Sequence, residues 1–208
     1  MMKRICSVLL AAALALSLTA CGGTKRESAQ AVVESAIGAV QNVDFAAMKT
    51  YWGEDTLGKV ESAAQPEADD EDAQVMKAVT KHLSYTVKES KEDEKAGTAT
   101  VTVEFTNADM TAIMSEFIQQ AFSDALNYAF LPEDQQPSEE EMDQKYLGIL
   151  TGLLAREDNK MVTNTVDISL KLTDDQWTIE SDDKVLDAML GGMLSSADSI
   201  SDSLGGDS

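Results

Sequence analysis

The sequence TATVTVEF, at residues 98–105, alternates small or apolar side chains with polar ones at a period of two. This period is typical of a β-strand with one buried face, because successive side chains of a strand point to opposite faces. The side chains that we expect in the core are Ala99, Val101, Val103 and Phe105. A sheet that keeps one face in water is antiparallel by preference, so the stretch predicts an antiparallel sheet.

Three further segments are predicted to complete this sheet. Residues 85–88 precede the stretch, and the charged loop at residues 92–97 ends in a glycine suited to a hairpin. Residues 162–172 alternate again, and residues 177–179 follow the tight turn at residues 173–176. In the third strand we expect inward-facing Val166, Ile168, Leu170 and Leu172. The fold class predicted is α+β, with a four-stranded antiparallel sheet packed on helices.

Helical periodicity marks three segments before the first strand. Residues 27–42 carry apolar side chains at helical spacing, and Asp44 is suited to cap a second short helix because its carboxylate can accept a free backbone N–H. A third helix is expected to begin in the acidic run at residues 67–72, where the helix dipole favours negative charge. The apolar stripe of this third helix is Val75, Met76, Val79 and Leu83.

Residues 107–155 predict a helical hairpin inserted between the second and third strands. Thr106-Asn107 is expected to cap a helix that runs to about Leu131, and Ser138 with Glu141 forms a capping box for the returning helix. The apolar residues of the first helix follow the helical period closely: Met110, Ile113, Met114, Phe117, Ile118, Ala121, Phe122, Ala125 and Ala129.

Gly148 and Gly152 lie about one turn apart in the returning helix. Each glycine costs a helix about 1 kcal/mol relative to alanine. We therefore expect a neighbouring backbone to pack closely against them.

The N-terminus has the pattern of an export signal. Lys3-Arg4 precedes an apolar run at residues 5–18, which is shorter than the about 20 residues that span a bilayer. The run ends in Leu18-Thr19-Ala20-Cys21, which resembles the lipobox of bacterial lipoproteins; the resemblance implies cleavage between Ala20 and Cys21 and a diacylglycerol on the Cys21 thiol. A plain secretory signal followed by an unrelated cysteine is the alternative. Two acyl chains anchor a protein stably, so we expect a location at the extracytoplasmic face of the cell membrane.

Four parts of the chain follow from these features. Residues 1–20 are expected to form the cleaved lipoprotein signal peptide and residues 21–26 the lipidated cysteine and tether. Residues 27–194 form a single α+β domain whose last helix is capped by Asp182-Asp183. Residues 195–208 are rich in Ser, Asp and Gly and predict a flexible tail.

The charge of the chain limits its partners. There are 16 basic and 37 acidic residues, and removal of the signal with Lys3 and Arg4 leaves 14 and 37, a net charge of −23. Nucleic acid is excluded as a partner because its binding needs a basic surface. Acidic groups are also repelled by anionic lipid, so the membrane contact is expected through the lipid on Cys21. The partners that remain are a small apolar ligand or an envelope protein.

Few residues could support catalysis or bind a metal. His82 is the only histidine, and it is expected near a helix C-terminus, where interaction with the last carbonyls explains it. Loss of Cys6 with the signal and lipidation of Cys21 would leave no thiol and no disulfide. One histidine cannot form a usual zinc site, and the acidic run lacks the spacing of a calcium loop. No nucleotide-binding motif is present, so no metal and no cofactor are expected.

The order of elements, with the junction at residues 42–48 and the hairpin at residues 174–179, resembles small lipoproteins of Gram-positive bacteria that have a nuclear transport factor 2-like, or cystatin-like, domain. The resemblance covers residues 27–194. It implies a curved, cone-like antiparallel sheet around helices, with an open end that can hold a ligand or partner. The inserted hairpin departs from the minimal cone, and the resemblance implies no functional residues.

The function predicted is a non-catalytic, membrane-anchored ligand- or protein-binding module. One alternative is a small cone-fold enzyme that uses His82 or a carboxylate inside the cavity. Another is the solute-binding component of a transporter, which the 188 residues after the signal disfavour because two lobes and a hinge need more chain. Ten methionines could line an adaptable apolar cavity, but core filling is the preferred explanation, because methionines at helical spacing need no ligand.

Overall fold

The computed structural model describes residues 26–52, 70–180 and 182–196. Helices α1 (Ala29–Gln41), α2 (Phe45–Trp52) and α4 (Asp70–Thr80) precede strands β1 (Ser84–Asp93) and β2 (Thr98–Ala108). Helices α5 (Met110–Ala129) and α6 (Glu139–Leu154) follow, with a short 3-10 turn at Glu133–Gln135 between them. Strands β3 (Met161–Thr173) and β4 (Gln176–Ile179) and helix α7 (Asp183–Met189) complete the order.

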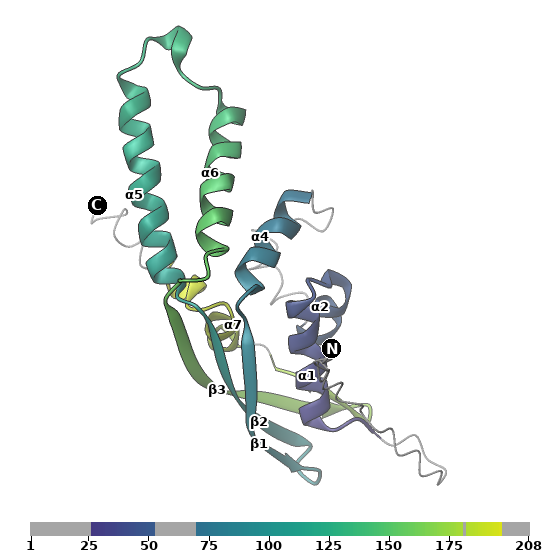
Figure 1. Cartoon of the computed structure of the whole chain (residues 1–208). Coiled ribbons are helices and arrows are strands. Elements are labelled where there is room, and N and C mark those ends of the chain that lie inside the picture. The colour runs from purple at the N-terminus through teal and green to yellow at the C-terminus, as the bar shows by residue number, and fades with distance from the viewer. Residues whose placement is uncertain (1–25, 53–69, 181, 197–208) are drawn as a thin grey trace, which may run out of the picture.

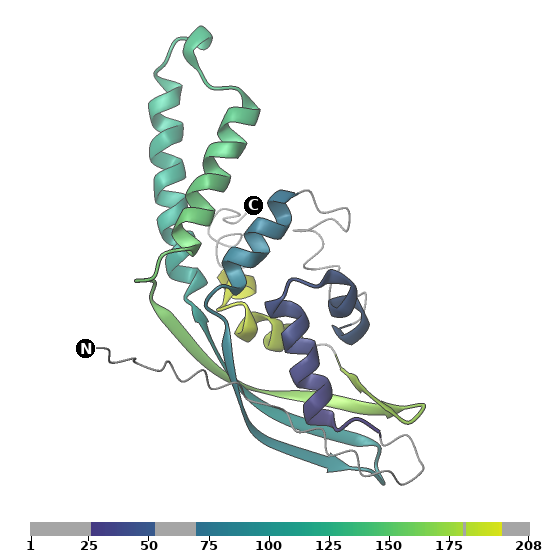
Figure 2. The same ribbon diagram turned by 45° about the vertical axis from the view of Figure 1, so that its right-hand side comes forward.

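The four strands form one antiparallel sheet in the order β1-β2-β3-β4. The sheet is curved, and α1, α2 and α7 lie on one side of it (Figures 1 and 2). The predicted α+β class with a curved four-stranded antiparallel sheet is therefore confirmed. The expected core-facing side chains of β2, from Ala99 to Phe105, are all buried.

The other face of the sheet is polar. Thr102 Oγ1 donates a hydrogen bond of 2.6 Å to Asp167 Oδ1 on β3, and Lys88 Nζ lies 2.7 Å from Glu104 Oε1. Cross-strand pairs of this kind suit a solvated face, since polar side chains there meet both water and each other. The structure thus shows the one wet face that the period-two pattern predicts.

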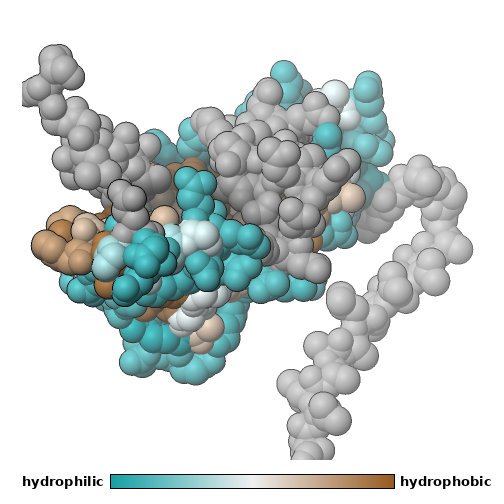
Figure 3. Space-filling view, turned by 90° about the horizontal axis from the view of Figure 1, so that it is seen from above, coloured by the Kyte–Doolittle hydropathy of each residue, from teal (hydrophilic) through white to brown (hydrophobic). Residues whose placement is uncertain are grey.

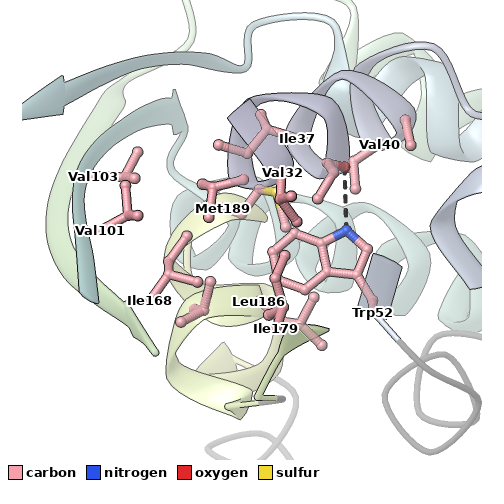
Figure 4. Close-up of a cluster of buried hydrophobic side chains, with 14 of the residues drawn as sticks. Val32, Ile37, Val40, Trp52, Val101, Val103, Ile168, Ile179, Leu186 and Met189 are labelled. Atoms are coloured by element: carbon pink, nitrogen blue, oxygen red, sulfur yellow. Dashed lines mark hydrogen bonds between the residues drawn. The ribbon is translucent and has the colours of Figure 1, made fainter. Parts of the chain in front are cut away.

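The main core lies between the sheet and helices α1, α2 and α7 (Figure 4). Trp52 at the end of α2 is buried in it, and its indole Nε1 donates to the carbonyl of Ala36 on α1 at 3.2 Å. Asp44 Oδ1 accepts from the backbone N–H of Ala47 at 3.0 Å. Asp44 is therefore the predicted N-cap of α2, and the cap fixes the helix that carries Trp52.

The expected cap at Thr106-Asn107 is wrong, because β2 continues to Ala108 and the cap of α5 is Asp109. The physical reason is the buried side chain of Asn107. Its Nδ2 donates to the carbonyls of Val79 and Met189, both at 3.1 Å, and its Oδ1 accepts from the N–H of Ala108 at 2.8 Å. Asn107 therefore joins the ends of α4 and α7 to the sheet.

A second apolar cluster lies next to Asn107, where the helical hairpin of α5 and α6 begins. Its members come from α4, both hairpin helices, the end of β2 and the residue after α7, and they are Val79, Ala108, Met110, Ile113, Leu153, Leu154 and Leu190. Burial of these side chains supplies the apolar contact that fixes the hairpin to the domain.

The hairpin itself confirms one prediction and contradicts another. Ser138 and Glu141 form the predicted capping box at the start of α6. A Cβ added at Gly148 or Gly152 would meet nothing within 4 Å, so the expected close packing of a backbone against these glycines is wrong. Spacing alone could not tell an exposed helix face from a packed one.

The last described residues make specific contacts with the domain, unlike a flexible tail. Asp182 caps α7 as expected, by accepting from the N–H of Lys184. Ser196, which the sequence assigns to the tail, is buried, and its hydroxyl lies 2.9 Å from that of Thr111 on α5. The rest of the predicted tail, at residues 197–208, lies outside the described residues.

Candidate functional site

Arg26 is fixed to one end of the sheet. Its Nη2 donates to Glu94 Oε1 in the β1–β2 loop at 2.6 Å, and its Nη1 donates to Asp175 Oδ1 in the β3–β4 turn at 3.0 Å. The guanidinium also lies 5.3 Å from the ring centroid of Trp177. A single exposed ion pair contributes little to the stability of a fold, but Arg26 makes two ion pairs and a cation–π contact at once. We name this arrangement the Arg26 clasp; sequence reasoning missed it by placing Arg26 in the tether.

The β3–β4 turn has a geometry that presents Asp175 to Arg26. Asp174 and Asp175 have φ of 50° and 62°, and positive φ at both central residues defines a type I′ hairpin turn. Such a turn matches the twist of the strands on either side. The tight turn predicted from the sequence is thus confirmed.

A cleft of about 510 Å³ opens beside the clasp. Its walls come from the start of the described chain, α1, α2 and β4, and include Arg26, Val32, Tyr51, Trp177 and Ile179. Trp177 is 5% exposed, and its indole Nε1 is buried without a hydrogen-bond partner in the part of the chain that the structure describes. A buried donor without a partner costs about 1–3 kcal/mol, so a ligand acceptor that reached it would recover free energy.

His82 lies away from this cleft. It follows the end of α4, is half buried, and does not line the cleft wall. Its Nε2 is buried and has no hydrogen-bond partner among the described residues, so this nitrogen does not make the expected contact with the last helix carbonyls.

The other predicted sites lie mostly outside the described residues. Ala20 and Cys21 fall in residues 1–25, and half of the acidic run at residues 67–72 falls in residues 53–69, while the other half begins α4. Among the residues that are described, no three His, Cys, Asp or Glu side chains are grouped so that they could hold a metal ion. Within the same residues, no helix has the length and apolar character needed to cross a membrane.

The α5–α6 hairpin projects from the end of the sheet opposite the clasp (Figure 1). Its two helices meet through Phe117 and Tyr146, whose rings pack edge to face at 6.3 Å. Farther along, Lys145 Nζ lies 2.8 Å from Asp124 Oδ2 and donates to the Tyr128 hydroxyl at 2.6 Å. These hydrogen bonds raise the pKa of Lys145 above its ordinary value.

At the base of the hairpin, Arg156 makes a two-pronged contact with Glu116. Nη1 and Nη2 lie 2.9 Å and 2.8 Å from the two carboxylate oxygens, and the pKa of Arg156 is raised mainly by these hydrogen bonds. Paired donors of this kind fix orientation as well as distance. The hairpin is therefore a defined unit whose inner face is already filled.

The outer side of α5 exposes an apolar surface that we name the hairpin stripe. It consists of Ile118, Phe122, Leu126, Phe130 and Leu131. Phe122 is 63% exposed and Phe130 is 86% exposed. Figure 3, which looks down on the hairpin end, shows apolar atoms gathered at the left edge, the side that α5 occupies in Figure 1.

Sequence reasoning placed Ile118 and Phe122 among the apolar positions of this helix but missed their exposure, and it did not include Leu126 or Phe130 in the apolar set. Of the α5 residues at apolar spacing, only Met110 and Ile113 are buried. The spacing shows that a helix has an apolar face, whereas exposure depends on whether another element covers it. The cluster at the hairpin base fully buries only Met110 and Ile113 of α5, and its contacts extend no farther along the helix than the partly buried Phe117.

Comparison with known proteins gives little beyond this geometry. No protein-family model matches the chain. No curated protein matches it either. A solved structure of a candidate lipoprotein (ycdA) from Bacillus subtilis is similar at a TM-score of 0.48 and 14% identity. The similarity covers 79% of this chain and 56% of that one, so the chain spans little more than half of its length, and a likeness this distant carries no inference about function.

Proposed function

We propose that the protein is a lipid-anchored extracytoplasmic lipoprotein that presents a non-catalytic protein-binding surface away from the membrane. The observation that carries the proposal is the position of the Arg26 clasp, at the end of the sheet opposite the hairpin stripe. An anchor close to Arg26 and a docking surface at the far end together define a display module.

The anchor would hold the clasp close to the bilayer. Only residues 22–25 separate Cys21 from Arg26, a span of at most about 18 Å when fully extended. Because Arg26 binds both Glu94 and Asp175, the β1–β2 loop and the β3–β4 turn would then face the membrane.

The hairpin stripe would lie far from the same membrane. Strand β2 leaves the clasp end and leads directly into α5, and the 20 residues of α5 add about 30 Å of helix. With the length of the sheet at about 3.3 Å per residue, the hairpin tip would stand roughly 50 Å from the anchor. Exposed apolar surface at that height is suited to bind a protein, since lipid is out of reach.

The cleft beside the clasp supports a second candidate, binding of a small ligand. Trp177 favours it, because this residue lines the cleft and its indole N–H has no acceptor among the described residues, and ligand sites combine apolar walls with a few polar groups. Native mass spectrometry of the full chain extracted from membranes would test it. A co-purified mass that is lost in a Trp177→Phe variant supports the ligand, and an unliganded mass in both contradicts it.

Lipid attachment is tested by a matched pair of cysteine variants. Cys21→Ser should leave an unprocessed precursor without lipid mass, whereas Cys6→Ser alters a residue that the cleaved signal removes and should have no effect. Wild-type protein is expected in the membrane fraction with an N-terminal diacylglyceryl mass, accessible to protease added outside intact cells. Mature protein without lipid mass, or equal behaviour of the two variants, would overturn the proposal.

A further inference from the structure

We propose that the hairpin stripe binds the same stripe of a second copy in the same membrane, in a parallel dimer with its two-fold axis normal to the bilayer. The inference rests on the proposed function for its orientation. It names the partner of the surface that the anchor would hold away from the lipid.

The charge around the stripe favours a second copy over a charged partner. In a chain with 37 acidic residues, the exposed side chains that flank the stripe on α5 are all neutral: Ser115, Gln119, Ser123 and Asn127. The carboxylate of Asp124 on the same helix faces α6, where it is paired with Lys145. Along α5, two strongly acidic molecules can therefore approach without placing unpaired carboxylates opposite each other, because the other α5 carboxylate, Glu116, is bound by Arg156.

The spacing of residues favours a helix pair. Ile118, Phe122, Ala125 and Ala129 are separated by four, three and four residues, which is the repeat of a seam between two helices. Ala125 and Ala129 are exposed, and their small side chains would let two α5 helices approach closely. The inner face of α5 is occupied by α6, and among the described residues no other element covers the exposed seam.

The area available fits a weak dimer that needs the membrane. Phe122 and Phe130 together offer roughly 250 Å² of side-chain surface, and the three aliphatic residues of the stripe add roughly 100 Å². Two copies would bury roughly 700 Å² of apolar surface. Because about 65% of a homodimer interface is apolar, the whole interface is roughly 1,100 Å², just above the about 1,000 Å² expected of a specific contact.

Anchoring would lower the entropy lost on pairing. Copies held by the clasp end already share one plane and one orientation, so less rotational freedom is lost than for molecules free in solution. In this orientation both α5 helices run away from the membrane, which makes the pair parallel. Each seam residue then lies near its own counterpart across the axis.

Cysteine cross-linking of the full chain in membranes tests the pairing. Ala125→Cys places a thiol in the seam, and Gln120→Cys places one at an exposed position of the same helix about 160° from Ile118 and Phe122, as a matched control. The wild-type chain serves as the blank for any unprocessed Cys6 or Cys21. After mild oxidation, Ala125→Cys should give a disulfide-linked product of twice the monomer mass in at least fivefold higher yield than Gln120→Cys. Adding Phe122→Ser should lower that yield at least fivefold.

Several results would overturn the pairing. Equal yields at the two positions, no product from a protein that is lipidated and membrane-bound, or a product whose mass is not twice that of the monomer would each do so. The membrane fraction and lipid mass of the same sample test the proposed function separately. Loss of lipid with a retained cross-link at position 125 would overturn the anchor and support the pairing.

Discussion

Replacing Gly191 by alanine should destabilise the protein more than the same change at its neighbour. Gly191 has a φ of +65°, and its carbonyl accepts from the N–H of Met110 at 3.0 Å. A Cβ built on Gly191 would clash with the carbonyl oxygen of Ala108, and only a backbone shift could relieve that contact. The change therefore strains the junction at which α7, β2 and α5 meet.

The neighbouring glycine separates the two sources of strain. Gly192 also has positive φ, at +83°, but a Cβ there meets nothing nearer than Thr111 Oγ1 at 3.9 Å. A left-handed backbone costs a non-glycine residue about 1–2 kcal/mol, and overpacking adds about 1–3 kcal/mol. We expect Gly192→Ala to lower the free energy of unfolding by about 1–2 kcal/mol and Gly191→Ala by about 2–5 kcal/mol.

Urea unfolding followed by tryptophan fluorescence and circular dichroism measures both variants. Since Trp52 and Trp177 lie in the main core, their emission reports loss of the fold. Equal destabilisation by the two alanines would show that the backbone of Gly191 does not approach Ala108 as the structure has it.

Four other substitutions test three separate parts of the fold. Gly148→Ala and Gly152→Ala should each raise the free energy of unfolding by up to about 1 kcal/mol, because nothing lies within 4 Å of the new Cβ. A loss of stability in urea titrations would instead indicate that a neighbouring backbone packs against these positions. Asn107→Ala should lower the free energy of unfolding by about 2–4 kcal/mol, because two buried carbonyls and one N–H lose their hydrogen-bond partner. Amide hydrogen exchange should then show faster opening of α4 and α7. Unchanged exchange in both helices would contradict this role of Asn107. Hydrogen bonding to Lys160 and to the N–H of Ala112 lowers the pKa of Asp109, so the stability that its carboxylate contributes is present above about pH 4 and is lost as the pH falls below that value. The difference in free energy of unfolding between wild type and Asp109→Ala should therefore shrink between about pH 5 and pH 3. A difference that stays constant over this range would refute the role of the Asp109 carboxylate.

The sheet could be predicted from the sequence because its signals are local. Alternation along residues 98–105, the charged loop that ends at Gly97 and the turn at Asp174-Asp175 each act within a few residues, and the structure has all three. The end of β2 could not be predicted in this way. The amide of Asn107 has the chemistry of a helix cap, and only its distant partners, Val79 and Met189, keep it in the strand.

The candidate site depended on contacts that the sequence does not display. Arg26 lies 68 residues from Glu94 and 149 residues from Asp175, so no local pattern marks the clasp. The exposure of Phe122 likewise depends on how far the cluster at the hairpin base extends. In contrast, a net charge of −21 is a property of composition and holds whatever the fold.

The distance of each end of the molecule from the bilayer tests whether the clasp end faces the membrane and the hairpin tip stands away from it. Full-length lipidated protein carrying a fluorophore at Lys95→Cys, in the β1–β2 loop, or at Gln135→Cys, in the hairpin tip, would be placed in vesicles that contain nitroxide-labelled headgroups. We predict strong quenching at position 95 and none at position 135, because the clasp end faces the lipid and the tip stands roughly 50 Å above it. Quenching at position 135 equal to or greater than that at position 95 would contradict the account.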